Sequence, residues 1–127
     1  MYYFWTVRVV RFVPISFVLA SIIAAYFYAG GNIHDPFQIG YSITHNFLSD
    51  LGGYKSHSGQ SNIVSALLFN ISMIMFVFVG IAFLFVPRLF KENNTNYFLA
   101  ILGSGFFFLG TVFFAGVGFT PYDLYID

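Results

Sequence analysis

Three long stretches without a charged residue constrain this chain more than any other feature of its sequence. They run from Phe12 to Ala29, from Ile63 to Val86 and from Tyr97 to Phe119. A helix rises about 1.5 Å per residue, so about 20 apolar residues cross the roughly 30 Å hydrocarbon core of a bilayer. Each stretch therefore predicts a transmembrane helix, and residues 1–127 together predict a single all-α integral membrane bundle.

The composition excludes several classes of protein. Only 8% of the 127 residues are charged, against about 25% in soluble domains, which excludes a soluble globular protein. Five basic and five acidic residues give a formal net charge of zero, so we expect no basic field that attracts nucleic acid or an anionic lipid surface. The chain has no cysteine, which excludes disulfides and thiolate metal sites. The expected partners are the lipid bilayer and other transmembrane helices, in homo- or hetero-oligomers, and no cofactor is predicted.

The basic residues predict an orientation. Arg8 and Arg11 precede the first stretch, Arg88 and Lys91 separate the second from the third, and the connection between the first two carries only Lys55. Because Lys and Arg concentrate in cytoplasmic loops, we expect the N-terminus in the cytoplasm and the C-terminus outside. A cleaved signal peptide is the alternative for the first stretch, but its apolar run exceeds the usual length of about 7–15 residues.

Small and kink-forming residues predict how the helices end and pack. Pro87 predicts the end of the second helix, and the short turn that follows makes the second and third helices antiparallel neighbours. Small residues recur on one stripe of the third stretch and at every fourth position of the first, where helices can approach closely. The two sets are Ser104, Thr111, Ala115 and Gly118, beside Gly103 and Gly110, and Ser16, Ala20 and Ala24.

The connection between the first two stretches contains a helix pattern. Asp35-Pro36 is typical of a helix start and Gly52-Gly53 of a stop, so we expect an amphipathic helix over residues 36–51. Its polar arc holds Ser42, His45, Asn46, Ser49 and Asp50. Such a helix lies flat on the outer leaflet in one interpretation. In the other, it folds back over the bundle and directs His45, Ser49 and Asp50 toward a cavity.

Other polar residues have simpler interpretations. The stretch Tyr54–Ser61 is rich in Gly and Ser and is expected to be a link. The spacing of the three histidines and of their aspartate neighbours matches no ligand motif, so no metal site is predicted. These residues are His34, His45, His57, Asp35 and Asp50. Asn70, inside the second stretch, is expected to face protein through a helix-to-helix hydrogen bond.

The end of the sequence carries a second helix-start pattern, Thr120-Pro121-Tyr122-Asp123. A helix start so close to the last residue suggests that the natural protein continues beyond Asp127, or that a short outer turn lies on the membrane.

Three segments resemble a family of prokaryotic multi-pass membrane proteins that is catalogued as a domain of unknown function. They are Asn46-Phe47-Leu48-Ser49-Asp50-Leu51-Gly52, Leu68-Phe69-Asn70 and Pro121-Tyr122-Asp123. The resemblance implies about six spans, of which this chain holds the N-terminal half. It also implies a histidine after the last segment, which this chain does not contain, and a shared site made by Ser49, Asp50, Asn70 and Asp123.

Three functions are compatible with these features. A non-enzymatic helix-packing subunit or scaffold is favoured, because the chain has few spans and no strong catalytic motif. The alternative is an outward-facing membrane hydrolase of a lipid or lipid-linked substrate, with Asp50 and Asp123 as acid, base or ligands and His45 and Ser49 beside them. A transporter fragment has the least support, because the spans lack charged residues.

Overall fold

The structure is a computed structural model, and it describes residues 4–121 of the chain. In chain order its elements are η1 (Phe4–Val9), α1 (Val10–Phe27), η2 (Leu48–Gly52), α2 (Ile63–Ile74), α3 (Phe76–Phe83), η3 (Val86–Phe90) and α4 (Asn94–Phe119). η1 is a π-helix, and η2 and η3 are 3-10 helices. The predicted all-α fold class is confirmed. The one strand-like pairing within the described residues is an isolated bridge between Lys55 and Ser61.

These elements form three long rods, as the sequence predicted. The rods Phe4–Phe27, Ile63–Phe90 and Asn94–Phe119 have 24, 28 and 26 residues, and each is long and apolar enough to cross a membrane. The first rod begins at Phe4 rather than at Phe12 and therefore includes Arg8 and Arg11. Long basic side chains are compatible with a helix end, because their stems lie on apolar surface while the charge reaches water.

The middle rod is not a continuous α-helix. α2 and α3 are separated at Met75, and Pro87 lies inside the 3-10 turn η3 rather than at the end of an α-helix. Proline lacks an N–H, and its ring displaces the carbonyl of the residue four positions earlier, which here is Phe83. Regular α-helix accordingly ends at Phe83, before the end at Val86 that the sequence predicted.

The third rod begins at Asn94, three residues before the predicted start at Tyr97. Asn93 is the reason, because its side-chain oxygen accepts hydrogen bonds from the backbone N–H of Thr95 at 3.0 Å and of Asn96 at 3.1 Å. An asparagine cap of this kind satisfies backbone donors that have no partner inside the helix.

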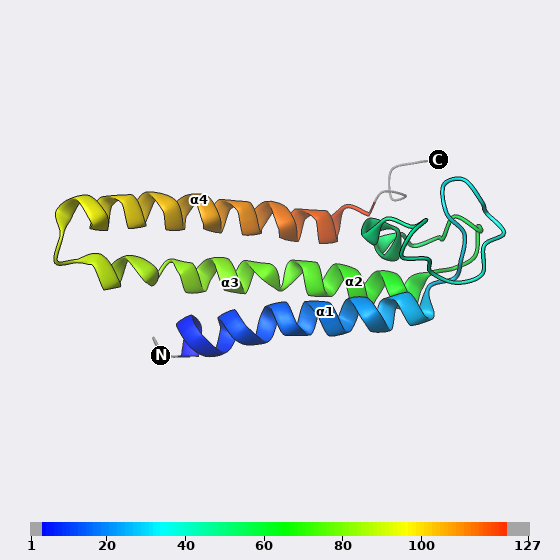
Figure 1. Cartoon of the computed structure of the whole chain (residues 1–127), viewed down its shortest axis with the longest axis horizontal. Coiled ribbons are helices and arrows are strands. Elements are labelled where there is room, and N and C mark those ends of the chain that lie inside the picture. Colours follow the sequence, from blue (N-terminus) through cyan, green and yellow to red (C-terminus); the bar gives the residue numbers. More distant parts are fainter. Residues whose placement is uncertain (1–3, 122–127) are drawn as a thin grey trace.

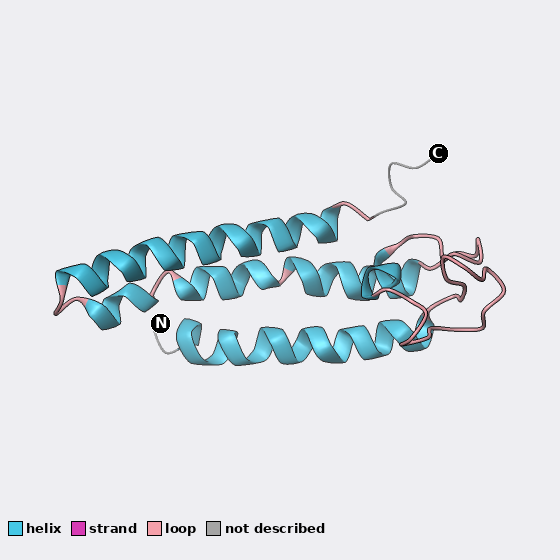
Figure 2. Ribbon diagram, turned by 45° about the horizontal axis from the view of Figure 1, so that its top comes forward, coloured by secondary structure: helices cyan, strands magenta, loops and turns pink. Residues whose placement is uncertain are grey.

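The three rods form a single layer in which α2 and α3 lie between α1 and α4 (Figures 1 and 2). Neighbouring rods run antiparallel, which confirms the prediction for the second and third rods. Within an apolar stretch of 18 residues in each rod, 39% of the stretch is buried in the central rod, whereas 17% is buried in the first rod and in the third. The two outer rods therefore leave most of their apolar surface without a protein neighbour in the described chain.

The small-residue stripe of the third rod does contact the central rod. The buried residues of α4 are Ser104, Thr111, Ala115 and Gly118, as the sequence predicted. Two glycines allow the close approach: a Cβ on Gly80 would collide with the Thr111 hydroxyl, and one on Gly118 would lie 2.5 Å from the Asn70 carbonyl oxygen. In the first rod, Ala24 is buried but Ser16 and Ala20 are only partly so.

Residues 28–62 join α1 to α2 and fold into a lobe at one end of the layer, which we call the polar cap (Figure 1). The prediction of an amphipathic helix over residues 36–51 is wrong. All of these residues are described, and helical backbone occurs there only in η2, over Leu48–Gly52.

Local hydrogen bonds explain why the predicted helix does not form. The Asp35 carboxylate accepts from the N–H of Phe37 at 2.9 Å, within a turn, and Gly40 has a φ of 68°, which is outside the right-handed helical region. The side-chain oxygen of Asn46 accepts from the N–H of Ser42 at 2.9 Å. Side chains of Asp and Asn compete in this way with the backbone bonds of a helix.

Candidate functional site

The polar cap contains half of the buried polar side chains of the described residues. Asn32, Asn46, Asp50, Ser56 and Asn62 are each 9% exposed or less. Burying a polar group is costly unless it is hydrogen-bonded, so a cluster of this kind requires a connected set of partners. Hydrogen bonds centred on Asp50 and Asn46 provide that set.

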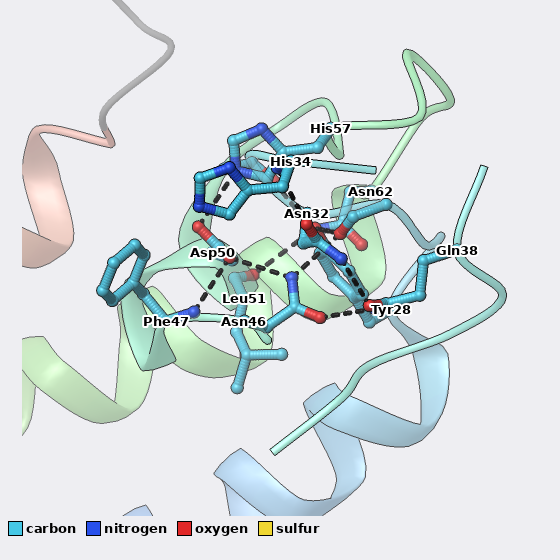
Figure 3. Close-up of polar contacts among 12 residues, drawn as sticks. Tyr28, Asn32, His34, Gln38, Asn46, Phe47, Asp50, Leu51, His57 and Asn62 are labelled. Carbon is cyan, nitrogen blue, oxygen red and sulfur yellow. Dashed lines mark hydrogen bonds and ion pairs between the residues drawn. The ribbon is translucent and has the colours of Figure 1, made fainter. Parts of the chain in front are cut away.

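Asp50 lies at the centre of the cap and is 5% exposed (Figure 3). Its Oδ2 accepts from the side-chain amide of Asn46 at 2.9 Å and from the backbone N–H of Phe47 at 3.0 Å. Its Oδ1 lies 3.1 Å from Nε2 of His57. Three donors from two segments of the cap therefore converge on one carboxylate, and the bond from Phe47 also closes the first turn of η2.

Asn46 connects the carboxylate to the rest of the cap. Its amide nitrogen donates to the Gly31 carbonyl at 2.8 Å as well as to Asp50. Its amide oxygen accepts from Nε2 of Gln38 at 2.6 Å and from the N–H of Ser42 at 2.9 Å. All of the hydrogen-bonding capacity of this side chain is used, and it ties together four separate positions of the connection.

Side chains at the start of the central rod and at its cap residue Asn62 hold η2 in place. The three consecutive carbonyls of residues 51–53 accept hydrogen bonds from Asn62, Ser65 and Asn70, at distances of 2.9 to 3.4 Å. Asn70 is 6% exposed and donates to the Gly52 carbonyl at 2.9 Å. Asn70 does face protein, as predicted, but its partner is the cap and not another long helix.

Gly52 is required where the cap meets the central rod. A Cβ at this position would lie 2.6 Å from the Asn70 side-chain oxygen and 2.9 Å from the Phe69 ring. Contacts that short force a displacement of neighbouring atoms. The glycine therefore allows η2 to approach α2 closely enough for the hydrogen bond from Asn70.

Two tyrosines border the buried carboxylate. Burial raises the pKa of Tyr41, and the negative charge of Asp50 raises it further. Burial also raises the pKa of Tyr28, against a smaller lowering by a hydrogen bond with the His57 backbone, and the Asp50 charge adds to the increase. The Tyr28 hydroxyl donates to the Gly31 carbonyl at 2.9 Å. Both phenols therefore keep their proton to a higher pH than a free tyrosine does.

The predicted site residues are not brought together as the helical spacing implied. His45 is exposed, and its ring contacts the hydroxyls of Thr44 at 2.8 Å and Ser42 at 3.2 Å. Ser49 is also exposed, and Asp123 lies outside the described residues. Of the predicted set, Asp50 alone among the described residues lies inside the buried network.

The histidine that contacts Asp50 is His57, which lies in the stretch that was predicted to be only a link. Its side chain is 24% exposed, and it lies in a tight turn in which Gly59 has a φ of 82°. A Ser-Gly pair after a histidine is a turn signal, and a chain reversal there returns His57 toward η2. This signal was available in the sequence, although it does not identify the partner.

The three segments that carry the family resemblance meet at one small pocket. Ser49, Gly52, Asn70 and Pro121 line a cavity of about 130 Å³ between η2 and the end of α4. Space of this size holds a few water molecules, at about 30 Å³ each. The described residues contain no group of three or more His, Cys, Asp or Glu side chains placed to hold a metal ion.

Comparisons with protein-family models, curated proteins and solved structures give no match for this chain. The resemblance to a family of multi-pass membrane proteins therefore stays a prediction.

Proposed function

We propose that this chain is a helix-packing subunit of a membrane assembly, in which the outer face of α4 contacts another transmembrane helix. The observation that carries the proposal is the single layer of rods, in which α4 covers the central rod with one stripe and is otherwise exposed. Only 17% of the 18-residue apolar stretch of α4 is buried, against 39% of the corresponding stretch of the central rod.

Glycines on the exposed side of α4 support this proposal. Gly103 and Gly110 are seven residues apart, which places them on the same face of a helix. A Cβ at either position would meet nothing within 4 Å. Inside the chain, by contrast, Gly80 and Gly118 are the points where rods come into close contact. Small residues serve the same purpose between helices of separate chains in a bilayer.

A groove continues along this face. It has a volume of about 500 Å³ and is lined by Gly103, Ala100 and Phe107 of α4, and by Phe83 and Phe90 near the end of the central rod. An apolar groove beside an open glycine position fits the side chains of a neighbouring helix, because close van der Waals packing drives helix association in lipid.

The assembly is tested with a pair of matched glycine substitutions. Gly110→Leu adds a bulky side chain to the proposed contact face, and Gly105→Leu adds the same side chain at another open position, on a different face of α4. Both raise helix propensity by the same amount. We expect Gly110→Leu to convert the assembly, measured by size in mild detergent and by crosslinking, to the free chain, and Gly105→Leu to leave it intact. A wild-type chain that extracts as a monodisperse monomer without a partner contradicts the proposal.

We also propose that the end of the layer opposite the polar cap faces the cytoplasm. η1 and the start of α1, which contain Arg8 and Arg11, lie at that end, as do η3 and the turn after it, which contain Arg88 and Lys91 (Figure 1). Trp5 of η1 stacks there on Phe85, with the ring centroids 6.4 Å apart. The chain has no cysteine, so single cysteines report sidedness without background. An impermeant maleimide added outside is expected to label Ile39→Cys in the cap and not Asn93→Cys in the α3–α4 turn, and the reverse result refutes this orientation.

Hydrolysis of a lipid or lipid-linked substrate is the second candidate function, and the Asp50–His57 pair is the observation that favours it. A carboxylate that orients an imidazole is a common arrangement for a general base. His57→Gln is expected to abolish such an activity, whereas the matched change His45→Gln, at an exposed histidine outside the network, leaves it unchanged. Equal activity of the two variants removes this candidate.

A further inference from the structure

A second cavity lies at the end of the layer opposite the polar cap. It has a volume of about 410 Å³ and lies between the first rod and the central rod, where Trp5, Arg8, Phe12 and Val13 face Met75 and Phe78. This volume is within the range of about 300–1,000 Å³ that is usual for ligand pockets. η1, which forms one wall, is a π-helix, a rare conformation that is frequent at functional sites.

The lining combines one cation with an apolar interior. Of the described residues that line the cavity, Arg8 alone is charged, and the others are aromatic or aliphatic apart from Met75. Trp5 and Val13 are eight residues apart, or about 12 Å along a helix. The cavity therefore extends from the level of the Arg8 guanidinium well into the apolar part of the rod.

The charges of the chain are separated along the layer, although they sum to zero. Arg11, Arg88 and Lys91 lie at the same end as Arg8, and Glu92 is the acidic residue among the described ones there. Asp35 and Asp50 belong to the polar cap at the other end, together with one basic residue, Lys55. The formal net charge thus conceals a basic end, which attracts anionic groups.

We infer that this cavity binds an anionic phospholipid of the surrounding bilayer, with its phosphate on Arg8 and an acyl chain against Phe12, Val13 and Met75. Phe12 is 63% exposed, so the cavity is open at the surface of the first rod. A guanidinium has five N–H donors and binds phosphate while it keeps other contacts. Basic pockets between membrane helices recognise anionic headgroups by this combination.

The position of Trp5 provides a direct test, because it is the single tryptophan of the chain and it lines the cavity. The full chain is reconstituted in phosphatidylcholine vesicles that contain phosphatidylglycerol, with bromine on the acyl chains of one lipid or the other. Quenching of Trp5 fluorescence then reports which lipid occupies the cavity. We expect about a fivefold preference for phosphatidylglycerol, which equals about 1 kcal/mol for one basic side chain at 1.4 kcal/mol per tenfold.

Arg8→Gln and Arg11→Gln are matched variants, since each removes one positive charge from the same end and only Arg8 lines the cavity. We expect Arg8→Gln to abolish the preference, and Arg8→Lys and Arg11→Gln to retain it. Circular dichroism of each variant establishes that the rods remain helical. Replacing chloride by inorganic phosphate at constant ionic strength is expected to leave Trp5 quenching unchanged, because the acyl chain holds the lipid.

Three results overturn the inference. They are equal quenching by the two lipids in the wild-type chain, weak quenching by both, and an equal loss of preference in Arg8→Gln and Arg11→Gln. The last result assigns the preference to the charge of the whole end rather than to the cavity. None of them bears on the contact face of α4, which the glycine variants test separately.

Discussion

Replacing Asp50 by Asn tests whether the buried carboxylate organises the polar cap. The substitution keeps the shape of the side chain and removes its charge. Asn still has an oxygen that accepts from Asn46 and Phe47, and an amide that faces His57. The substitution removes the part that the negative charge contributes to the strength of the hydrogen bonds that Asp50 accepts.

The size of the effect follows from those contacts. Hydrogen bonds to charged groups contribute about 1.5–3 kcal/mol and neutral ones about 0.5–1.5 kcal/mol, so each bond weakens by about 1 kcal/mol. The two bonds from Asn46 and Phe47 together lose about 2 kcal/mol. Loss of the contact with His57 adds little, because that side chain is 24% exposed and water replaces its partner. At 1.4 kcal/mol per tenfold, the population of opened caps rises about 30-fold.

Limited proteolysis measures this population. Lys55 is the one trypsin site between residues 28 and 62, and the next residue, Ser56, is buried and donates its N–H to the Gln60 carbonyl at 3.0 Å. Cleavage after Lys55 therefore requires the cap to open, and its rate follows the opened population when opening is fast. The fragment that ends at Lys55 is quantified by mass spectrometry.

Asp35→Asn is the matched control, because it removes the same charge from an exposed carboxylate that accepts one bond, from Phe37. We expect it to change the rate of cleavage after Lys55 by less than the Asp50 variant does. A rate that is unchanged in Asp50→Asn, or equally increased in both variants, refutes the assignment of Asp50 as the centre of the cap.

Three further changes have expected outcomes. Gly52→Ala places a Cβ 2.6 Å from the Asn70 side-chain oxygen and should destabilise the cap by about 1–3 kcal/mol, which the same proteolysis measures. Gly80→Ala overpacks the contact with α4 and should lower stability in detergent unfolding by about 1–3 kcal/mol, whereas Gly105→Ala, which meets nothing within 4 Å, should not lower it. Because the pKa of Tyr41 is raised in the folded chain, the unfolded chain loses that proton first, near pH 10. The contribution of Tyr41 to stability is therefore complete below that pH and lost as pH rises through the folded pKa. Tyrosinate absorbance should show a late phase to which Tyr28 also contributes, and Tyr41→Phe should reduce its amplitude.

The elements that were predicted correctly depend on neighbouring residues alone. The free energy of transferring a helix from water into the bilayer depends on the residues of that helix, and an uncharged apolar run makes it favourable independently of the rest of the chain. The buried stripe of α4 followed in the same way from spacing, since Ser104, Thr111 and Ala115 repeat with the helical period. The helix ends were less accurate, because the Asn93 cap and the effect of Pro87 on Phe83 shift them by a few residues.

The candidate site was predicted only in part. Asp50 was named, but its partner is His57 and not His45. Asn46 and Asp50, which were predicted to share one polar arc, do form a hydrogen bond at 2.9 Å, although no helix of the predicted length connects them. Residue spacing identifies which side chains share a face of a helix only if that helix forms. Over residues 36–51, side-chain hydrogen bonds to the backbone formed in place of the predicted helix.

The sequence by itself thus determined three apolar rods, their order along the chain and the face on which the third one packs, because each is a sum of local free energies. Tertiary structure alone decided the path of residues 28–62 and the partner of Asp50. Those features depend on contacts between segments that are distant in sequence, and a local pattern of residues does not specify such contacts.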